Sequence, residues 1–165
     1  MSLLLTVLVV ICLITPAAVS GSPTAEQVEK NVITHWRSIK KNIPQVTATE
    51  LKSRMDNGDE FVLLDVRKEA DFLAAHLPGA LNISRGELEF AVATAIPDTD
   101  TRIYVYCRTG IKATFAARTL IDIGYTNVAR VTDSFKGWLE AGYPVYNRHG
   151  AFVLQPNGFE LKSER

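Results

Sequence analysis

A cysteine, Cys107, stands between a short apolar run and a loop that carries two cationic side chains. The loop consists of Cys107, Arg108, Thr109, Gly110, Ile111, Lys112 and Ala113, and a helix-like pattern follows it. A thiol attacks as its thiolate, which nearby positive charge or a helix amino terminus stabilises. Arg108 and Lys112 supply charge, and Gly110 permits a turn whose backbone N–H groups face an anion. The pattern therefore predicts a nucleophilic, anion-attracting thiol.

Two other interpretations of this loop compete with a reactive thiol. Cys107 could be a structural residue beside unrelated surface cations, because cysteine is among the most often buried residue types. A protein tyrosine phosphatase also holds a thiolate in an anion-binding loop, but it needs an arginine six positions after the cysteine for a bidentate phosphoryl contact. That position holds Ala113, and Lys112 lacks the planar fork. The sequence therefore disfavours a phosphatase.

The elements that would position the loop alternate between strand-like and helix-like patterns. We predict strands at residues 45–46, 61–66, 80–83, 103–106 and 128–131, and helices at 48–57, 68–75, 87–95, 111–123 and 134–141. Thr47 and Glu50 fit a capping box at the start of one helix. The alternation predicts an α/β domain with a mostly parallel sheet and helices on both faces. Ligands of such sheets bind beyond the carboxyl ends of the strands, where Cys107 falls.

Length and charge limit the possible functions. The chain has 165 residues, of which 47% are hydrophobic and 22% charged, and this suits one globular domain. Eighteen basic and eighteen acidic residues give a formal net charge of zero. No overall field favours nucleic acid or an anionic membrane, so we predict no nucleic-acid partner and only local electrostatic recognition.

The first 21 residues fit a secretory signal peptide. They carry no charge, run apolar from Leu3 to Ile14, and end in small residues around Ala18-Val19-Ser20. They lack the usual basic start, and an uncleaved membrane anchor is the alternative, because spanning helices need roughly 17 to 25 residues. We expect an exported protein, periplasmic in a Gram-negative source or secreted, without stable membrane association once cleaved. Cleavage would remove Cys12 and leave Cys107 without an intramolecular disulfide partner.

Residues 22–44 form a predicted amphipathic helical extension. Its apolar positions recur at helical spacing and are Ala25, Val28, Val32, Trp36 and Ile39. We expect this helix to lie over the core of the domain with Trp36 as an anchor. His35 has no second metal ligand at helical spacing. Residues 148–165 are predicted to form a turn-rich tail, and no role can be assigned to them.

Several separated motifs resemble the rhodanese-like domain family, roughly from Val46 to Tyr146. The amino-terminal motifs are Leu64-Asp65-Val66-Arg67, Asp71-Phe72 and the stretch from His76 to Ile83. The loop motif runs from Tyr106 to Ala113, and the carboxyl-terminal motifs are Gly124-Tyr125, Gly137-Trp138 and Ala141-Gly142-Tyr143-Pro144. We divide the chain accordingly into a signal peptide (1–21), a helical extension (22–44), a rhodanese-like domain (45–147) and a tail (148–165).

The resemblance implies a single-domain sulfurtransferase that needs no metal or organic cofactor. Cys107 would take a sulfane sulfur from thiosulfate or a similar donor and pass it, through a persulfide, to cyanide or a thiol. The loop N–H groups from Arg108 to Ala113 would stabilise the persulfide, and Arg108 and Lys112 would attract the anionic donor. The alternative is a noncatalytic rhodanese-type module that binds a partner or senses sulfur or redox state. The oligomeric state stays undetermined.

The remaining motif residues are interpreted mainly as structural. Asp65 and Arg67 lie at the end of a buried strand, and buried charges are kept when they are paired. Arg67 would also add positive potential at the site. His76 is expected to hydrogen-bond within its loop, and Trp138 to lie in the core. The chain departs from the family where paired glycines are common, because it has Asp133-Ser134 there. This change would alter the loop that faces Cys107.

Overall fold

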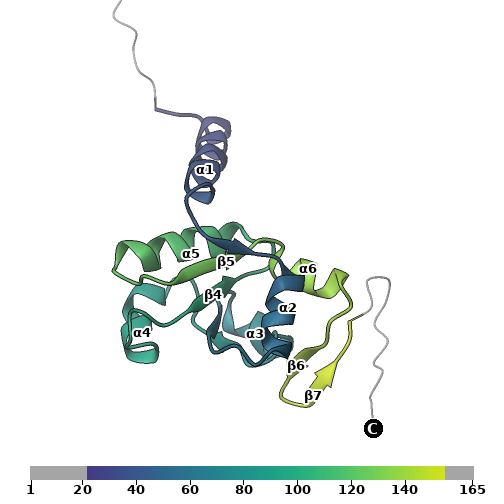
Figure 1. Cartoon of the computed structure of the whole chain (residues 1–165). Helices are drawn as coiled ribbons and strands as arrows, with labels where there is room; N and C mark the ends of the chain where they lie inside the picture. The colour runs from purple at the N-terminus through teal and green to yellow at the C-terminus, as the bar shows by residue number, and fades with distance from the viewer. Residues whose placement is uncertain (1–21, 155–165) are drawn as a thin grey trace, which may run out of the picture.

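The computed structural model describes residues 22–154, and a five-stranded sheet lies at its centre (Figure 1). The sheet order is β1-β5-β4-β2-β3, and every neighbouring pair is parallel. The strands are β1 Gln45–Val46, β2 Val62–Asp65, β3 Leu81–Asn82, β4 Ile103–Tyr106 and β5 Val128–Val131. The predicted α/β class with a mostly parallel sheet is therefore confirmed.

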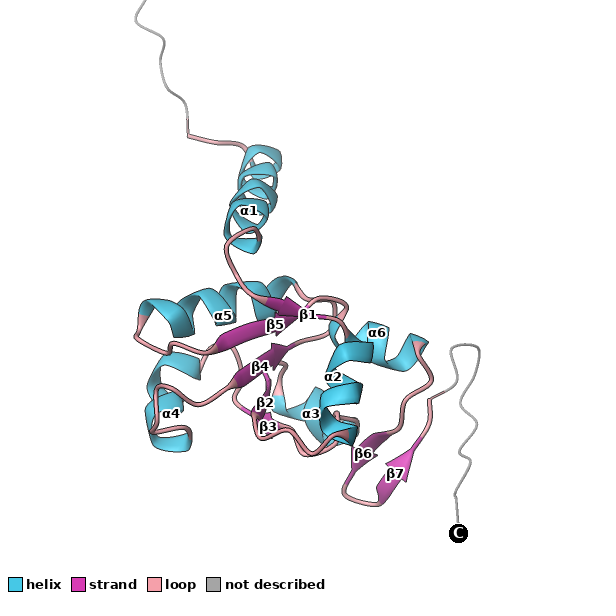
Figure 2. Cartoon of the chain, in the orientation of Figure 1, coloured by secondary structure: helices cyan, strands magenta, loops and turns pink. Residues whose placement is uncertain are grey.

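Helices cover both faces of this sheet (Figure 2). The helices of the described residues are α1 Ala25–Lys40, α2 Ala48–Asp56, α3 Glu69–Ala74, α4 Leu88–Ala95, α5 Ile111–Asp122 and α6 Ser134–Glu140. One buried cluster joins α4 and α5 to the sheet, and another joins α2 and α6 to the opposite face. The small residues Ala113, Ala116 and Ala117 of α5 are fully buried, so this helix packs close to the strands.

The central strand β4 explains the continuous apolar run before Cys107. Side chains alternate between the faces of a strand, and here both faces are covered. Ile103 and Val105 join the cluster under α4 and α5, whereas Tyr104 and Tyr106 join the cluster under α2 and α6. The strand therefore delivers Cys107 to the carboxyl edge of the sheet from a position fixed on both sides.

Two capping boxes set the starts of α2 and α1. Thr47 and Glu50 make the predicted reciprocal hydrogen bonds, with Glu50 N donating to Thr47 Oγ1 at 3.1 Å and Thr47 N donating to Glu50 Oε2 at 2.7 Å. Thr24 and Gln27 form a second box that the sequence analysis does not identify. It places the first residue of α1 at Ala25, three positions after the predicted start.

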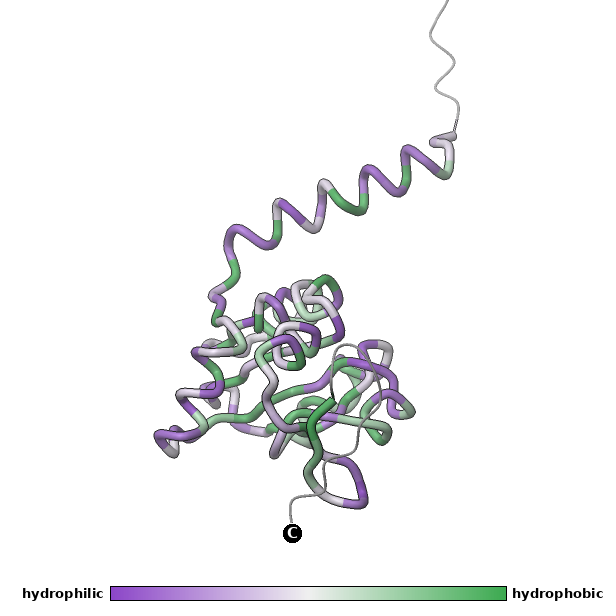
Figure 3. The backbone as a smooth tube through the Cα atoms, turned by 90° about the vertical axis from the view of Figure 1, so that its right-hand side faces the viewer, coloured by the Kyte–Doolittle hydropathy of each residue, from purple (hydrophilic) through white to green (hydrophobic). Residues whose placement is uncertain are grey.

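The prediction that α1 covers the core is wrong. No residue of α1 is buried, and Val28 and Val32 are 46% and 48% exposed. Figure 3 shows the helix extending away from the body of the domain. The cause is that α4 and α5 already cover this face of the sheet. The carboxyl-terminal half of α1 therefore contacts the first turns of α5, and Ile39 is partly buried against the core cluster. Trp36 is half-buried there.

A hairpin, β6 Val145–Asn147 and β7 Gly150–Phe152, occupies part of the region for which the sequence predicts only turns. Tyr146 exchanges backbone hydrogen bonds with His76 at 2.9 and 2.8 Å. His76 Nδ1 also lies 2.9 Å from the carbonyl oxygen of Phe72, which confirms the expected hydrogen-bonding role of this histidine. The hairpin thus attaches to the loop after α3.

Residues 1–21 and 155–165 lie outside the described residues, so the signal peptide stays a prediction. Between residues 22 and 154, none of the helices combines the length and the apolar character that a membrane crossing requires.

Candidate functional site

Cys107 lies directly after β4, in a loop held by hydrogen bonds from two neighbouring segments. Its side chain is buried at 2% exposure, and its Sγ accepts a hydrogen bond from Gly110 N at 3.2 Å. Its own N–H donates to Ser134 Oγ at 3.3 Å, and its carbonyl oxygen accepts from Phe135 N at 3.0 Å. The start of α6 therefore fixes the backbone on either side of the sulfur.

Gly110 is required at its position by both conformation and space. Its φ of +92° lies in the left-handed region, which side chains rarely adopt. A Cβ atom there would stand 2.5 Å from the carbonyl oxygen of Thr132. The loop consequently curls back against the end of β5, and α5 begins at the next residue. This close approach directs the Gly110 N–H at the sulfur.

A cavity of about 380 Å³ opens at Cys107. Its lining residues are Arg67, Asp71, Cys107, Arg108, Thr109, Ile111 and Lys112. Six of the eight predicted site residues therefore line this one cavity. Gly110 contacts the sulfur from within the loop, whereas Ala113 is buried in the core under α5 and does not line the cavity.

Asp71 is the lining residue that the sequence analysis does not assign to the site. It stands in the first turn of α3, which follows β2, and parallel strands bring the segments after β2 and β4 to the same sheet edge. Its position four residues after Arg67 is the signal that could have identified it. An acidic residue therefore lines the same cavity as the two cations of the loop.

Arg108 and Lys112 are exposed at the rim of this cavity. Neither takes part in the salt bridges found among residues 22–154. Their charge is therefore available to an incoming anion. Within the same described part of the chain, the hydrogen bond to Sγ comes from Gly110 N, so the donor role expected of the other loop N–H groups stays a prediction.

The expected Asp65–Arg67 pair is confirmed. Arg67 Nε donates to both carboxylate oxygens at 3.0 and 2.9 Å, and its terminal nitrogen donates to Oδ2 at 2.6 Å and to the carbonyl oxygen of Ala75 at 2.6 Å. Burial lowers the pKa of Arg67, but the hydrogen bonds and the charge of Asp65 outweigh this effect and hold the pKa above its ordinary value. The guanidinium also faces the Phe135 ring at 4.0 Å. Arg67 therefore forms a rigid, charged wall of the cavity.

Ser134 occupies the place where the resemblance leads one to expect glycine. Its φ is +52°, a left-handed conformation that is uncommon outside glycine. Its buried hydroxyl accepts from Cys107 N and donates to the carbonyl oxygen of Val131 at 2.9 Å. The serine keeps the glycine-like backbone and adds a bridge between the cysteine loop and the end of β5.

The sequence of the domain matches a family model over this same architecture. Residues 47–141, more than half of the chain, match the rhodanese-like domain. The chain belongs to the rhodanese-like domain family. The match begins after α1 and ends with α6, so the amino-terminal helix and the β6–β7 hairpin lie outside the matched residues.

Relatives of this rhodanese-like chain include named sulfurtransferases. It is 31% identical over 97 residues to the putative sulfur carrier protein YrkF of Bacillus subtilis, covering 59% of this chain and 51% of YrkF. It is 37% identical over 65 residues to thiosulfate sulfurtransferase PspE of Escherichia coli, covering 39% and 62%. The human single-domain sulfurtransferase TSTD1 has a similar structure, with a TM-score of 0.55 at 29% identity, covering 60% of this chain and 97% of TSTD1.

The chain spans about half or less of the length of the first curated relatives that it matches. The comparisons therefore show the rhodanese-like family and the presence of sulfurtransferases among its similar members.

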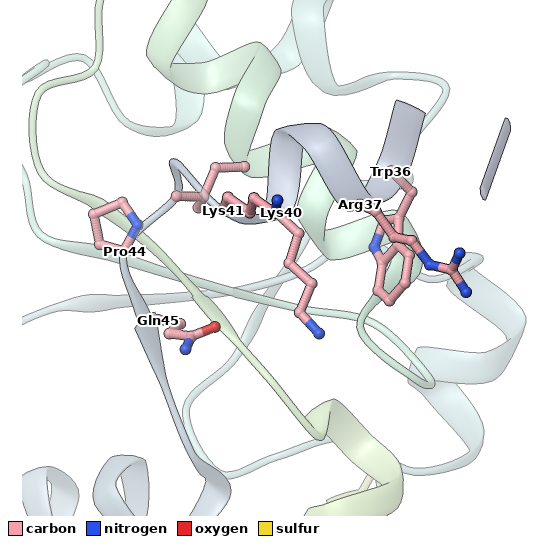
Figure 4. Close-up of a pocket in the computed structure, with 7 residues that line it drawn as sticks. Trp36, Arg37, Lys40, Lys41, Pro44 and Gln45 are labelled. Atoms are coloured by element: carbon pink, nitrogen blue, oxygen red, sulfur yellow. The ribbon is translucent and has the colours of Figure 1, made fainter. Parts of the chain in front are cut away.

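A second cavity, of about 570 Å³, lies where α1 leads into β1 (Figure 4). Its lining residues are Trp36, Arg37, Lys40, Lys41, Ile43, Pro44 and Gln45. Lys40 Nζ stands 4.8 Å from the centre of the Trp36 ring, a cation–π contact. Cations in the last turn of a helix offset its dipole, which accounts for the charge here. The cavity at Cys107 therefore remains the candidate functional site.

Proposed function

We propose that this protein is a sulfurtransferase that moves a sulfane sulfur from thiosulfate, or a similar donor, to cyanide or a thiol through a persulfide on Cys107. The observation that carries the proposal is the position of Sγ, which lines a cavity edged by Arg108 and Lys112 and accepts the N–H of Gly110. Thiosulfate sulfurtransferases among the relatives support the reaction type.

The reaction consists of two displacements on sulfur. The Cys107 thiolate attacks the outer sulfur of thiosulfate, a new S–S bond forms, and sulfite leaves with the electron pair of the broken S–S bond. Cyanide then attacks the terminal sulfur of the persulfide, thiocyanate leaves, and the thiolate is restored. A covalent intermediate divides the transfer into two easier steps and gives ping-pong kinetics. No external oxidant or reductant is needed.

The cavity suits these steps in charge and geometry. Thiosulfate is a dianion, and the exposed side chains of Arg108 and Lys112 would attract it to the rim. The N–H of Gly110 already points at Sγ, and a preorganised donor stabilises negative charge without rearranging during the reaction. Arg67 is held by Asp65, so it would contribute positive potential from a fixed position. Each loop cation therefore has a role in binding the donor.

We also propose that the protein acts outside the cytoplasm. The support is the uncharged apolar pattern of residues 1–21 and its small-residue ending before Gly21. The intact mass of the protein recovered from its native source tests this directly. A mass that corresponds to a chain beginning near Gly21 agrees with export and cleavage. An uncleaved chain in the cytosolic fraction contradicts the proposal.

The decisive experiment combines a thiocyanate assay with mass spectrometry. The wild-type protein should form thiocyanate from thiosulfate and cyanide, and thiosulfate alone should add one sulfur atom to Cys107. The variant Cys107→Ser should lose both signals while its circular dichroism spectrum is unchanged. The matched control is Cys12→Ser made in the uncleaved chain, where it removes the other cysteine and should retain both signals.

The outcome that overturns the proposal is a wild-type protein that forms no thiocyanate and gains no sulfur. That result would favour the alternative of a noncatalytic rhodanese-type module that binds a partner or senses sulfur or redox state. Undiminished activity in Cys107→Ser would instead refute the choice of nucleophile.

A further inference from the structure

A chain of hydrogen bonds connects the amino-terminal helix α1 to the sulfur of Cys107. Trp36 Nε1 donates to Thr114 Oγ1 at 3.1 Å, and Thr114 Oγ1 donates to the carbonyl oxygen of Gly110 at 2.8 Å. Gly110 N donates to Cys107 Sγ at 3.2 Å. Trp36 lies outside the residues that match the family, so this connection is an addition to the rhodanese-like domain.

The direction of this chain is fixed by its donors. An indole N–H only donates, and a threonine hydroxyl has a single proton. Since Trp36 donates to Thr114 Oγ1, the hydroxyl proton of Thr114 is directed to its other partner, the carbonyl oxygen of Gly110. Thr114 is fully buried. Water therefore cannot readily replace either bond.

Gly110 depends on such bonds because glycine restricts its own backbone least. Its carbonyl oxygen accepts from Thr114 Oγ1 and also from Thr114 N at 3.0 Å, while its N–H donates to the sulfur. Bonds on both sides of the residue thus hold φ at +92°. Weakening the bonds on the carbonyl side frees the N–H to turn away from Sγ.

Because α1 makes only limited contact with the domain, the series of hydrogen bonds that starts at Trp36 is an important part of its attachment. No residue of α1 is buried, and its contacts with α5 include Trp36 on Thr114 and a tilted ring contact of His35 with Phe115, at 5.8 Å between centroids. Figure 4 shows Trp36 in the last part of the helix, among the side chains that line the cavity extending to Gln45. Trp36 is therefore a principal link between the helix and the loop-bearing α5.

We propose that Trp36 and Thr114 are positioning residues for Cys107, so that docking of α1 sets the reactivity of the thiol. The effect of this positioning on the rate of sulfur transfer rests on the proposed sulfurtransferase function. The helix does not touch the reacting atoms. It acts through Thr114, which orients Gly110, whose N–H stabilises the thiolate and the persulfide that forms from it.

The test uses the full-length chain with Trp36→Phe, Thr114→Val, the double variant and the conservative Thr114→Ser. Two rates are measured on the Cys107 peptide by mass spectrometry: alkylation by iodoacetamide, and persulfide formation from thiosulfate. Trp36→Phe loses one hydrogen bond of about 1 kcal/mol and should slow both rates about fivefold. Thr114→Val loses both side-chain bonds of Thr114 and should slow the rates at least as much. Thr114→Ser, which keeps the hydroxyl, should retain the wild-type rates.

Two further readouts separate positioning from a merely structural role. The double variant should be no slower than Thr114→Val, because both substitutions break the same chain of bonds. In the thiocyanate assay, kcat should fall while KM for thiosulfate stays unchanged, because neither residue lines the donor cavity. The control is Val32→Ala, an exposed position on the same helix, which should leave both rates unchanged.

Unchanged rates in Trp36→Phe, or additive effects in the double variant, would overturn the proposal. Trp36 is half-buried at the surface, so its variant keeps the test valid even where Thr114→Val is unstable. If wild-type protein forms no persulfide but alkylation follows the expected pattern, the sulfurtransferase function fails and the positioning role stands.

Discussion

Replacing Ser134 by glycine should destabilise the protein less than replacing it by alanine, which is the reverse of the usual effect of these two residues on stability. The residue holds a left-handed φ of +52°, and its buried hydroxyl joins Cys107 N to the carbonyl oxygen of Val131. Both Ser134→Ala and Ser134→Gly remove these two hydrogen bonds. They differ in the backbone, because glycine adopts the left-handed region freely and alanine does not.

The magnitudes follow from those contacts. Two net hydrogen bonds of about 1 kcal/mol each put the loss in Ser134→Ala at about 2 kcal/mol of unfolding free energy, since the left-handed strain remains. Ser134→Gly relieves strain of about 1–2 kcal/mol, partly offset by the greater freedom of glycine in the unfolded chain. We expect the unfolding free energy of the glycine variant to be about 1 kcal/mol higher than that of the alanine variant, and still lower than that of the wild type.

Urea unfolding followed by tryptophan fluorescence measures this order. The midpoints should decrease from wild type to Ser134→Gly to Ser134→Ala at a common slope, because the surface exposed on unfolding is the same. An alanine variant as stable as the glycine variant, or more so, would refute the assignment of strain to this residue. A glycine variant as stable as the wild type would instead mean that the hydroxyl contributes nothing.

Three other perturbations have defined outcomes. Asp65→Asn should lower the unfolding free energy by about 3–5 kcal/mol in urea, since Arg67 keeps a buried charge without its partner; a loss below about 1 kcal/mol would contradict this. Gly110→Ala should lower the melting temperature and slow thiocyanate formation more than about tenfold, because its Cβ meets backbone; normal activity would show that the loop adapts. Burial raises the pKa of Tyr106 and of Tyr125, and the charge of Asp65 adds to the effect at Tyr106. The unfolded chain therefore releases these protons first, so stability should fall as the pH rises above about 10, and less steeply in Tyr106→Phe and in Tyr125→Phe. Urea midpoints between about pH 9 and 11 check this, and equal slopes in all three proteins would contradict it.

The sheet is the part of the fold that the sequence predicts well. Strands β4 and β5 match the predicted residues 103–106 and 128–131, because parallel strands buried on both faces carry near-continuous apolar runs, interrupted in β5 by Arg130. The β6–β7 hairpin is missed because its attachment is a backbone pairing of Tyr146 with His76, seventy residues earlier in the chain. No side-chain pattern records a contact of that kind.

The candidate site also has a part that the sequence predicts and a part that it does not. Cys107, Arg108 and Lys112 are close in sequence, so their proximity is predictable from one loop. Asp71 and Ser134 come from other segments. The family resemblance already places the loop of Ser134 opposite Cys107, but Asp71 reaches the cavity through the order of the strands. The amphipathic pattern of α1 likewise predicts a helix but not the surface that it contacts, because neighbouring helices had already covered the sheet.

The pairing of β1 with β5 determines when the site can become complete during folding. Gln45 lies beside Arg130, 85 residues further along the chain, and their side chains hydrogen-bond. Bringing such distant segments together is slow, because the entropy of closing the loop is lost before the contacts form. The segment that carries Trp36 leads directly into β1, so its bond to Thr114 should close among the last events. The reactivity of Cys107 would then indicate that the chain has completed folding, and a newly made molecule would carry a comparatively inert thiol until its edge strand is in place.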